Sequence, residues 1–314
     1  MSRPINRIAV IGTGVIGASW AALFLSRGLE VVATDPAPGA EERLRSMVDG
    51  FWPALNRIGM VDDASVARLR FEHDLARTVS GADFIQENGP ERVDIKRTLL
   101  AEIDAAADPD VIIATSSSGI LISAIQDAAR HPERVLLGHP FNPPHLIPLV
   151  EVVGGKLTSQ DAIDTAMAFY TVIGKKPIHI RREVPGHVAN RLQAALWREA
   201  FHLLEQGVAS VADIDTAIAH GPGLRWALLG PFLNLHLSGG AAGIGHTIDH
   251  LGPPIESWWQ DLGAPTHFSS PLRAQAIAGI AAELAAYDFP ETVRQRDEAL
   301  ISLLALKTAS EQLP

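Results

Sequence analysis

The chain has 314 residues, of which 47% are hydrophobic and 20% charged, and its formal net charge is −10. This composition excludes a disordered chain, and the acidic balance excludes the basic footprint of a protein that binds nucleic acid. The sequence contains no cysteine, which excludes disulfides, thiol nucleophiles and cysteine-bound metals, and we expect no metal site. Two domains are expected, because single hydrophobic cores stop growing at about 250–300 residues.

The N-terminal residues have some features of a signal peptide, with Arg3 and Arg7 before a mostly apolar run over 8–25. Glycines interrupt this run at 12, 14 and 17, which favours a folded element over a leader. No later apolar run approaches the ~20 residues that a membrane span needs. We therefore expect a cytoplasmic protein that has no membrane partner.

The first stretch has the pattern of a dinucleotide-binding unit. A buried strand is predicted over 8–11, the motif GTGVIG occupies 12–17, a helix follows over 15–28, and a second strand covers 29–34. Asp35 then lies at roughly the spacing of about 20 residues that such units show. These flanking elements distinguish the glycine motif from an ordinary turn.

Each position of the glycine motif has a physical role in a dinucleotide site. Gly12 permits the tight turn, Gly14 lets the backbone approach a pyrophosphate, and Gly17 lets the helix pack closely on the strand. The helix begins at Val15 and Ile16, where free N–H groups and the positive end of the helix dipole face the phosphates. The motif therefore predicts a phosphate cradle.

The acid after the second strand indicates which dinucleotide is bound. Asp35 would accept hydrogen bonds from the ribose hydroxyls, and the next basic residue along the chain is Arg43. A 2′-phosphate would meet a carboxylate with no adjacent arginine. The sequence therefore predicts NAD rather than NADP as the cofactor.

The chain continues with alternating strands and helices. We expect strands at 82–86, 111–115 and 135–138, a short strand near 71–74, and helices at 40–70 (broken near 58–59), 75–79, 93–107 and 119–130. This alternation predicts an α/β fold with a doubly wound, Rossmann-type parallel sheet. Ligands of such sheets bind beyond the carboxyl ends of the strands. The polar residues expected at that edge are Asp35, Glu91, Ser117, His139 and Asn142.

The stretch 139–151 is the best candidate for the chemistry. The strand over 135–138 would deliver His139 at its carboxyl end, and the prolines that follow forbid a helix. A second apolar run brings Glu151 back to the same region. Histidine suits a general base because its unperturbed pKa is ~6.5. His139 as a buried structural histidine is the alternative, and His145 is a rival base for which a surface or substrate-shaping role is expected.

The second domain is predicted to be all-helical. A helix over 159–173 and a strand over 177–180 complete the first domain, and a polar break at 181–186 ends it. We expect a dinucleotide-binding domain at 1–184 and a helical domain at 185–314. The helices expected in the second domain are 188–205, 211–219, 231–237, 241–251, 271–287 and 290–306.

Several motifs together resemble those of the 3-hydroxyacyl-CoA dehydrogenase superfamily over nearly the whole chain. They are GTGVIG at 12–17, Glu91 with Lys96, the serines 116–118, HPFNPP at 139–144, LVE at 149–151 and VPGHVANR at 184–191. The resemblance implies an NAD-dependent dehydrogenase whose helical domain forms a homodimer.

The same resemblance implies roles for individual residues. It implies that His139 is the general base and that Glu151 is its partner. It also implies that Ser117 and Asn190 contact the reacting oxygen. The residues implied near the nicotinamide are Glu91, Lys96, Ser117 and Asn142. From the residues alone, Glu91 could equally be a charge favoured at a helix start, and one of the serines 116–118 could cap a helix.

Two departures from the CoA-dependent members point to a small substrate. Residues 40–70 hold five arginines and no lysine, where those members carry lysines for the CoA phosphates, and the pair Arg225-Trp226 is inserted near Gly230. In these features and in the tail 239–314 the chain is similar to the carnitine dehydrogenase and gulonate dehydrogenase (lambda-crystallin) branch, which oxidises small free 3-hydroxy acids.

The inserted pair suggests how such a substrate would be held. Arg225 would bind a carboxylate in a bidentate manner or form an ordinary ion pair. An aromatic cage for a trimethylammonium group could come from Trp226, Phe232, Trp258 and Trp259, which could equally be packing anchors. We expect NAD-dependent oxidation of L-carnitine first and L-gulonate second. A dehydrogenase of CoA thioesters and a non-catalytic dinucleotide-binding structural protein stay open as alternatives.

Overall fold

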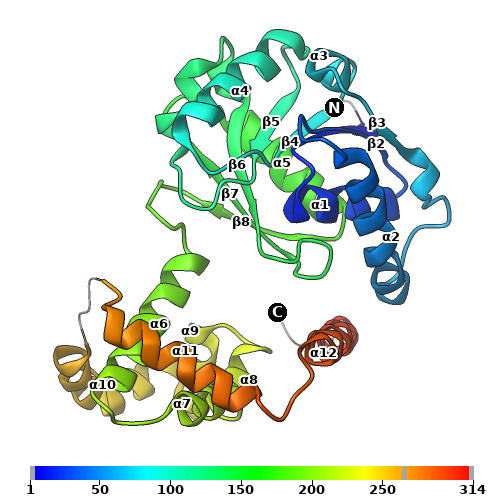
Figure 1. The fold of residues 1–314 in the computed structure, drawn as a ribbon. Coiled ribbons are helices and arrows are strands. Elements are labelled where there is room, and N and C mark those ends of the chain that lie inside the picture. The colour runs from blue at the N-terminus through cyan, green and yellow to red at the C-terminus, as the bar shows by residue number, and fades with distance from the viewer. Residues whose placement is uncertain (1–3, 264–266, 311–314) are drawn as a thin grey trace. The chain divides into compact units, whose positions relative to one another are not determined.

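The computed structural model describes residues 4–263 and 267–310 (Figure 1). The chain divides into two compact units, Met1–Arg191 and Leu192–Pro314. The expected domain boundary, between residues 184 and 185, lies a few residues before this division. No helix within the described ranges has the length and apolar character that crossing a membrane requires.

The N-terminal unit is built on one eight-stranded sheet with the order β3-β2-β1-β4-β5-β6-β7-β8. Adjacent strands are parallel except for β6 and β7, which pair antiparallel. The order places β1 between β2 and β4, where the winding direction reverses, and ligands of such folds bind at this point. The strands are β1 (Arg7–Ile11), β2 (Glu30–Thr34), β3 (Leu69–Phe71), β4 (Phe84–Glu87), β5 (Ile112–Thr115), β6 (Val135–Pro140), β7 (Leu149–Gly154) and β8 (Lys176–Ile180).

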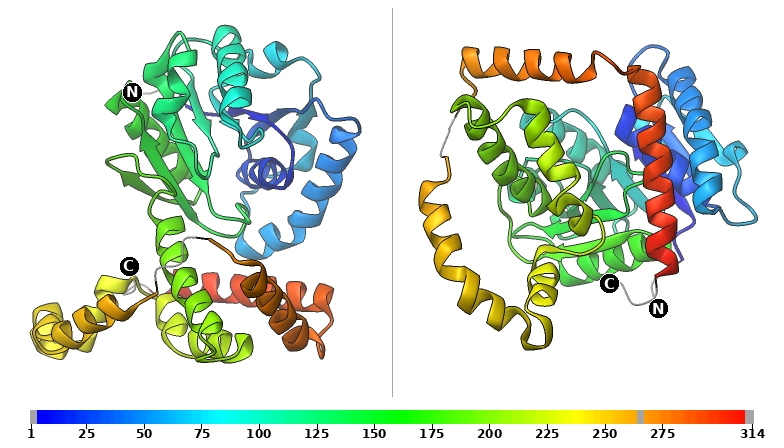
Figure 2. Two further views of the ribbon diagram at one scale, coloured as in Figure 1. Left: turned by 60° about the vertical axis from the view of Figure 1, so that its left-hand side comes forward. Right: turned by 90° about the horizontal axis from the view of Figure 1, so that it is seen from below.

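Helices cover both faces of this sheet (Figures 1 and 2). Along β1, Ile8 and Val10 enter one hydrophobic core while Ala9 and Ile11 enter the other. Because both faces are buried, the central strands are hydrophobic throughout, as the sequence predicts for a doubly wound sheet. The helices on the first face are α1 (Val15–Ser26), α2 (Ala40–Ile58) and α5 (Gln160–Val172), and those on the second are α3 (Leu75–Val79) and α4 (Val93–Ala106).

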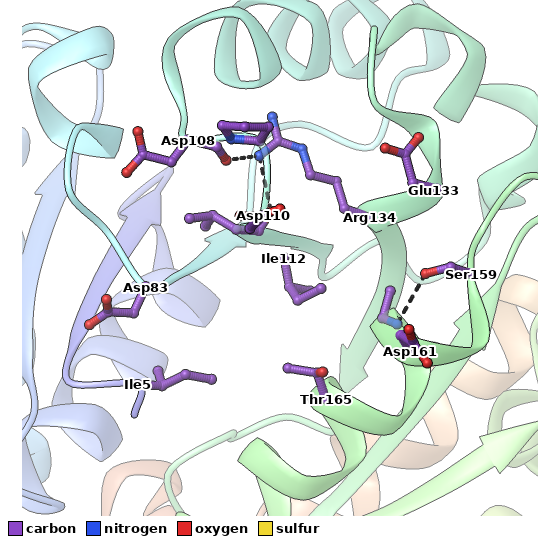
Figure 3. Close-up of a pocket in the computed structure, with 13 residues that line it drawn as sticks. Ile5, Asp83, Asp108, Asp110, Ile112, Glu133, Arg134, Ser159, Asp161 and Thr165 are labelled. Atoms are coloured by element: carbon purple, nitrogen blue, oxygen red, sulfur yellow. Dashed lines mark hydrogen bonds between the residues drawn. The ribbon is translucent and has the colours of Figure 1, made fainter. Parts of the chain in front are cut away.

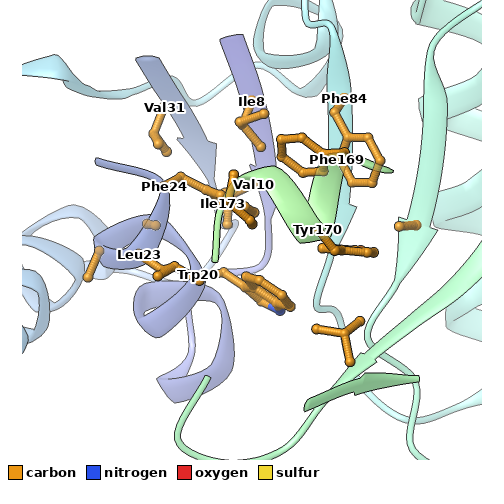
Figure 4. Close-up of a cluster of buried hydrophobic side chains, with 14 of the residues drawn as sticks. Ile8, Val10, Trp20, Leu23, Phe24, Val31, Phe84, Phe169, Tyr170 and Ile173 are labelled. Atoms are coloured by element: carbon orange, nitrogen blue, oxygen red, sulfur yellow. The ribbon is translucent and has the colours of Figure 1, made fainter. Parts of the chain in front are cut away.

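The aromatic part of the first core positions the strand that carries His139 (Figure 4). Tyr170 packs against Trp20 at 5.6 Å between ring centroids, and its hydroxyl donates to Oε1 of Gln86 at 2.7 Å. Burial raises the pKa of Tyr170, so this hydroxyl stays protonated. A Cβ on Gly138 would lie 2.0 Å from the Tyr170 oxygen, so only glycine fits directly before His139.

The helix expected over 119–130 is absent, and this prediction was wrong. Short 3₁₀ segments replace it at Ile122–Ala124 and Gln126–Ala128. Tertiary hydrogen bonds override the local helical pattern at both ends. Glu91 accepts the backbone N–H groups at the start of the segment, and Gln126 bonds to Thr158 near its end.

The described part of the second unit is all-helical, as expected, and its last helix, α12, is drawn in red in Figure 2. Its helices are α6 (Ala189–Glu205, which begins in the first unit), α7 (Val211–Ala219), α8 (Pro222–Trp226), α9 (Pro231–Ser238), α10 (Gly243–Asp261), α11 (Ser270–Leu284) and α12 (Phe289–Ala309). The short helix α8 was not predicted.

The helix expected to end at residue 251 continues as α10 to Asp261, through Pro253 and Pro254. This boundary was predicted wrongly because proline removes the N–H that bonds four residues back. The carbonyl groups left without that bond belong to Asp249 and His250, which are exposed and can bond to water.

Candidate active site

The antiparallel pairing of β6 with β7 brings His139 and Glu151 together. The two residues are direct cross-strand partners, so their side chains leave the same face of the sheet. Nδ1 of His139 lies 2.8 Å from Oε2 of Glu151, and both side chains are buried. The sequence therefore identified two residues that are in direct contact in the fold.

The second carboxylate oxygen of Glu151 is also occupied. Its Oε1 accepts the backbone N–H groups of Val188 and Ala189, each at 2.9 Å. Burial alone would raise the pKa of Glu151, but the hydrogen bonds from His139, Ala189 and Val188 together lower it. An ionised Glu151 can only accept, so Nδ1 of His139 carries the proton, and Nε2 is left to take one from a substrate.

Ser117 lies in the loop that follows β5, and Asn190 contacts the same loop. The buried Ser117 hydroxyl donates to Oε1 of Glu91 at 2.7 Å, and Nδ2 of Asn190 donates to the Ser118 carbonyl at 3.4 Å. Because Ser117 already donates to a carboxylate, it would have to rotate its proton to donate to a substrate oxygen. The roles expected for these residues at the reacting oxygen stay predictions.

Glu91 organises this loop rather than capping a helix. Besides Ser117, its carboxylate accepts the backbone N–H groups of Ser118, Gly119 and Ile120. Burial alone would raise the pKa of Glu91, but the hydrogen bonds from Ser117, Gly119 and Ile120 and the charge of Lys96 outweigh it and lower that pKa. The anionic carboxylate therefore fixes the backbone beside Ser117.

Lys96 is buried in an ion pair that the sequence did not reveal. Its Nζ lies 2.9 Å from Oε2 of Glu87, at the end of β4, and also donates to the Gly89 carbonyl. Thr115, at the end of β5, donates to the same carboxylate at 2.5 Å. In this structure Lys96 thus supports the loop after β4. Glu87 directly follows the strand predicted over 82–86, and that position was the available signal for it.

The loop after β6 corrects the expectation for His145. This residue is buried, not at the surface, and its Nδ1 lies 2.8 Å from the Ser19 hydroxyl, which also accepts its backbone N–H. Its ring stacks on Phe51 at 4.2 Å between centroids. Such contacts with α1 and α2 suit a structural residue. Asn142, in the same loop, is exposed.

The glycine motif has the geometry of a phosphate cradle. Gly12 has a φ of 85°, and a Cβ on Gly17 would lie 1.9 Å from the Gly12 carbonyl oxygen. By contrast, no atom lies within 4 Å of a Cβ built on Gly14, so the start of α1 is open to a ligand. Val15 is also exposed there. These residues fit a dinucleotide whose phosphates face the helix N-terminus.

Asp35 lies at the end of β2, beside the glycine turn. Its carboxylate accepts the backbone N–H groups of Thr13 at 2.8 Å and Ala37 at 2.9 Å, and each oxygen can accept further bonds. It lines a cavity of about 420 Å³ together with Glu41, Glu42, Phe71 and His73. Among the residues described, no lysine or arginine lines this cavity, which therefore suits an adenosine ribose without a 2′-phosphate.

A second cavity lies at the opposite edge of the sheet, before the first residues of β1, β4, β5 and β6 (Figure 3). Its volume is about 650 Å³ and five carboxylate residues line it, namely Asp83, Asp108, Asp110, Glu133 and Asp161. Arg134 also lines this cavity but is paired with Asp104 at 2.7 Å, so the excess of carboxylates would repel a pyrophosphate. The cofactor therefore fits the carboxyl ends of the strands and not the cavity at their amino ends.

The residues expected to bind substrate in the helical unit are exposed. Arg225 and Trp226 end α8, while Trp258 and Trp259 belong to α10. Within the described ranges, no ring contact joins these tryptophans to one another or to Phe232. An aromatic cage within this unit stays a prediction.

Together, the open phosphate cradle, the acid after β2 and the buried histidine–glutamate pair at the same sheet edge define a dinucleotide-dependent dehydrogenase. Comparison with known proteins agrees. The family model "3-hydroxyacyl-CoA dehydrogenase, NAD binding domain" matches residues 7–184, and the C-terminal domain model of the same family matches residues 186–265. The chain belongs to the 3-hydroxyacyl-CoA dehydrogenase family and is an NAD-dependent oxidoreductase.

Individual relatives cover nearly the whole chain. It is 49% identical to an L-carnitine dehydrogenase of Nocardiopsis dassonvillei, over 95% of this chain and 91% of the relative. It is 48% identical to an L-carnitine dehydrogenase of Bacillus cereus, over 96% of this chain and 92% of the relative. Among solved structures, one similar chain is 5-formyl-3-hydroxy-2-methylpyridine 4-carboxylic acid 5-dehydrogenase, described as an NAD⁺-dependent dismutase. It is 32% identical with a TM-score of 0.82, and the match covers 99% of this chain and 100% of that chain.

Proposed function

We propose that this enzyme oxidises the 3-hydroxyl group of L-carnitine to the 3-keto acid, with L-gulonate as the second candidate. The observation that carries the reaction is the buried contact of 2.8 Å between Nδ1 of His139 and Oε2 of Glu151. The choice of substrate is supported by the similarity to L-carnitine dehydrogenases over at least 95% of the chain.

His139 would act as the general base. Its Nε2 takes the proton of the substrate hydroxyl while hydride leaves the adjacent carbon, and bound NAD supplies the hydride acceptor. The ionised Glu151 compensates the imidazolium that forms and holds the ring in place. Ser117 and Asn190 would contact the oxygen as its charge changes.

The cofactor would lie along the carboxyl edge of the sheet. Gly12, Gly14 and Gly17 with the amides of Val15 and Ile16 would hold the pyrophosphate, and Asp35 the adenosine ribose. Glu91 and Asn142 would lie near the nicotinamide. Lys96 would act there through the loop that it and Glu87 hold, since its ammonium already contacts the Glu87 carboxylate at 2.9 Å.

We propose that residues of the helical unit also bind the substrate. Arg225 would bind the carboxylate, and Trp226, Trp258 and Trp259 would face the trimethylammonium group. We also propose a homodimer through this unit, a cytoplasmic location and no nucleic-acid partner. The dimer is supported by large apolar side chains that are exposed in the isolated chain, such as Phe268 at 67%.

A substrate panel tests the proposal. Purified enzyme with NAD would be given L-carnitine, L-gulonate, 3-hydroxybutyrate and 3-hydroxybutyryl-CoA, and NADH formation would be followed by absorbance. We expect kcat/KM for L-carnitine to exceed the others by at least about tenfold, which corresponds to about 1.4 kcal/mol of transition-state binding. Higher kcat/KM with the CoA thioester would contradict the proposal and favour the acyl-CoA activity after which the family is named.

A further inference from the structure

His187 lies beside the catalytic pair, in an unusual backbone conformation. Its φ is 53°, and it is the only non-glycine residue in the described ranges with a positive φ. Its side chain is only 1% exposed. Outliers of this kind persist only where surrounding contacts determine them, and they cluster at functional sites.

The backbone that follows His187 is bound by the carboxylate of Glu151. The next two residues, Val188 and Ala189, donate their N–H groups to Oε1 of Glu151, each at 2.9 Å. The backbone that carries His187 is therefore tied to the same side chain that orients His139.

The ring of His187 forms no hydrogen bond of standard geometry to the residues that the structure describes. Both of its nitrogens, Nδ1 and Nε2, are buried. Buried His139, in contrast, has a side-chain partner at 2.8 Å. Because buried polar groups are nearly always paired in folded proteins, the nitrogens of this imidazole are available to a partner from outside the chain.

The distance between the two rings defines where that partner would lie. The centroids of His139 and His187 are 5.3 Å apart, with the ring planes tilted by 49°. One oxygen atom can bond to a nitrogen of each ring at this separation, since each hydrogen bond spans about 2.8 Å. Proton transfer to His139 requires the substrate hydroxyl to contact that ring.

His187 is suited to donate rather than to act as a second base. Burial lowers the pKa of His187, and the neighbouring His139 lowers it further, while Glu151, the nearby Ser117 backbone and Glu91 act in the opposite direction without outweighing them. A neutral imidazole keeps one N–H, and neutral histidines can polarise a substrate carbonyl in this way.

From this geometry we infer that His187 is a further catalytic residue that donates a hydrogen bond to the oxygen on C3 of the hydroxy acid. The inference rests on the proposed function. During oxidation the hydroxyl proton passes to Nε2 of His139, hydride passes from C3 to the cofactor, and the oxygen becomes a carbonyl. His187 keeps its proton throughout and stabilises the negative charge on the oxygen.

The test compares three variants of the full-length enzyme with NAD and L-carnitine. His187→Phe removes both nitrogens but keeps a planar ring, while His187→Asn and His187→Gln each keep an N–H at the position of one ring nitrogen. Asparagine also tolerates a positive φ. We expect His187→Phe to lower kcat about 100-fold, as for loss of one oxyanion donor, and at least one amide variant to recover tenfold or more.

A second measurement does not depend on turnover. The dissociation constant of L-carnitine would be measured by calorimetry in His139→Ala and in His139→Ala/His187→Phe, both saturated with NAD, and we expect weaker binding in the double variant. The inference about His187 would be overturned, and the proposed function would stand, if kcat of His187→Phe were within about twofold of wild type. Equal losses of kcat in all three variants would have the same meaning. A wild-type enzyme inactive on every hydroxy acid would overturn the proposed function, and this inference with it.

Discussion

The two units of this chain differ in how much of their apolar surface they bury. The N-terminal unit has two hydrophobic cores, one on each face of its sheet. In the described residues of the helical unit, only Leu204, Leu272 and Ile301 are buried apolar side chains. Phe232, at 77%, and Trp259, at 66%, are mostly exposed there. The first unit buries two apolar cores, whereas the second leaves large apolar side chains exposed in the single chain, as the proposed homodimer requires.

The units differ in the same way in their charges. The N-terminal unit buries paired charges at 2.7–2.9 Å, including Lys96–Glu87 and Arg134–Asp104. In the helical unit the described ion pairs, such as Arg294–Glu291, are exposed. Exposed ion pairs contribute little to the free energy of unfolding, while buried ion pairs hold the residues that form them in defined positions. Proton transfer is therefore expected to depend on the first unit and assembly on the second.

The strongest test of this division is His139→Ala. We expect kcat to fall at least about 100-fold, because a general base contributes about 10²–10⁴-fold, while the oligomeric state stays unchanged. NADH formation and light scattering measure the two effects. His131→Ala, at an exposed histidine of the same unit, is the control and should keep wild-type kcat. Retention of activity in His139→Ala would mean that its contact with Glu151 is structural.

Asp35→Ala tests the cofactor end of the same unit. Loss of hydrogen bonds from a charged acceptor costs about 1.5–3 kcal/mol, so we expect the ratio of kcat/KM with NAD to that with NADP to fall about tenfold to a hundredfold. Initial rates with each dinucleotide give this ratio. Glu30→Ala, at the exposed start of the same strand, should leave it unchanged. An unchanged ratio in Asp35→Ala would show that other residues select NAD.

The double substitution Phe268→Ser and Phe289→Ser tests the helical unit. These residues are 67% and 65% exposed in the single chain, and we expect their loss to raise the dissociation constant of a homodimer at least about tenfold, since burying one large side chain contributes about 1.5–3 kcal/mol. Sedimentation across a concentration series measures it. Val172→Ser, at an 84% exposed site of the first unit, is the matched control. Equal dissociation constants in the two variants would contradict the assignment of dimer formation to the helical unit.

Lys175→Met tests a contribution to stability. Lys175 is buried under the loop after β6, where its Nζ donates to the Ile147 carbonyl at 2.8 Å and to Pro144. Burial, with the charge of Arg27, lowers the pKa of Lys175 to about 7, below its unfolded value of ~10.4. Between these values the unfolded chain binds a proton that the folded chain does not, so stability rises with pH.

The difference in free energy of unfolding between wild type and Lys175→Met should therefore increase by about 2 kcal/mol from pH 7 to pH 9. Urea denaturation at each pH gives this difference. Lys156→Met, at an exposed site, is the control and should follow the wild-type pH profile. Parallel profiles for Lys175→Met and wild type would mean that the ammonium stays charged in the folded protein.

The sequence by itself determined the dinucleotide-binding half of the fold. A buried strand followed by Gly12, Gly14 and Gly17 is recognisable because backbone conformation and close packing at those positions are local requirements. The alternation of apolar strands with amphipathic helices also predicts the sheet and the edge on which Asp35 and His139 lie. The helical unit followed from its periodicity, including the bounds of α7, although the end of α10 and the short helix α8 did not.

Tertiary structure decided the details of the site. The antiparallel register of β6 and β7 sets the contact between His139 and Glu151, and pairing register over long sequence separation is not a local property. Burial of His145 against Ser19, the 3₁₀ segments in place of a helix, and the continuation of α10 through two prolines likewise depend on contacts or solvent exposure that distant residues set. His187 takes its conformation because Glu151 binds the two following amides, and nothing in its neighbouring sequence indicates that bond.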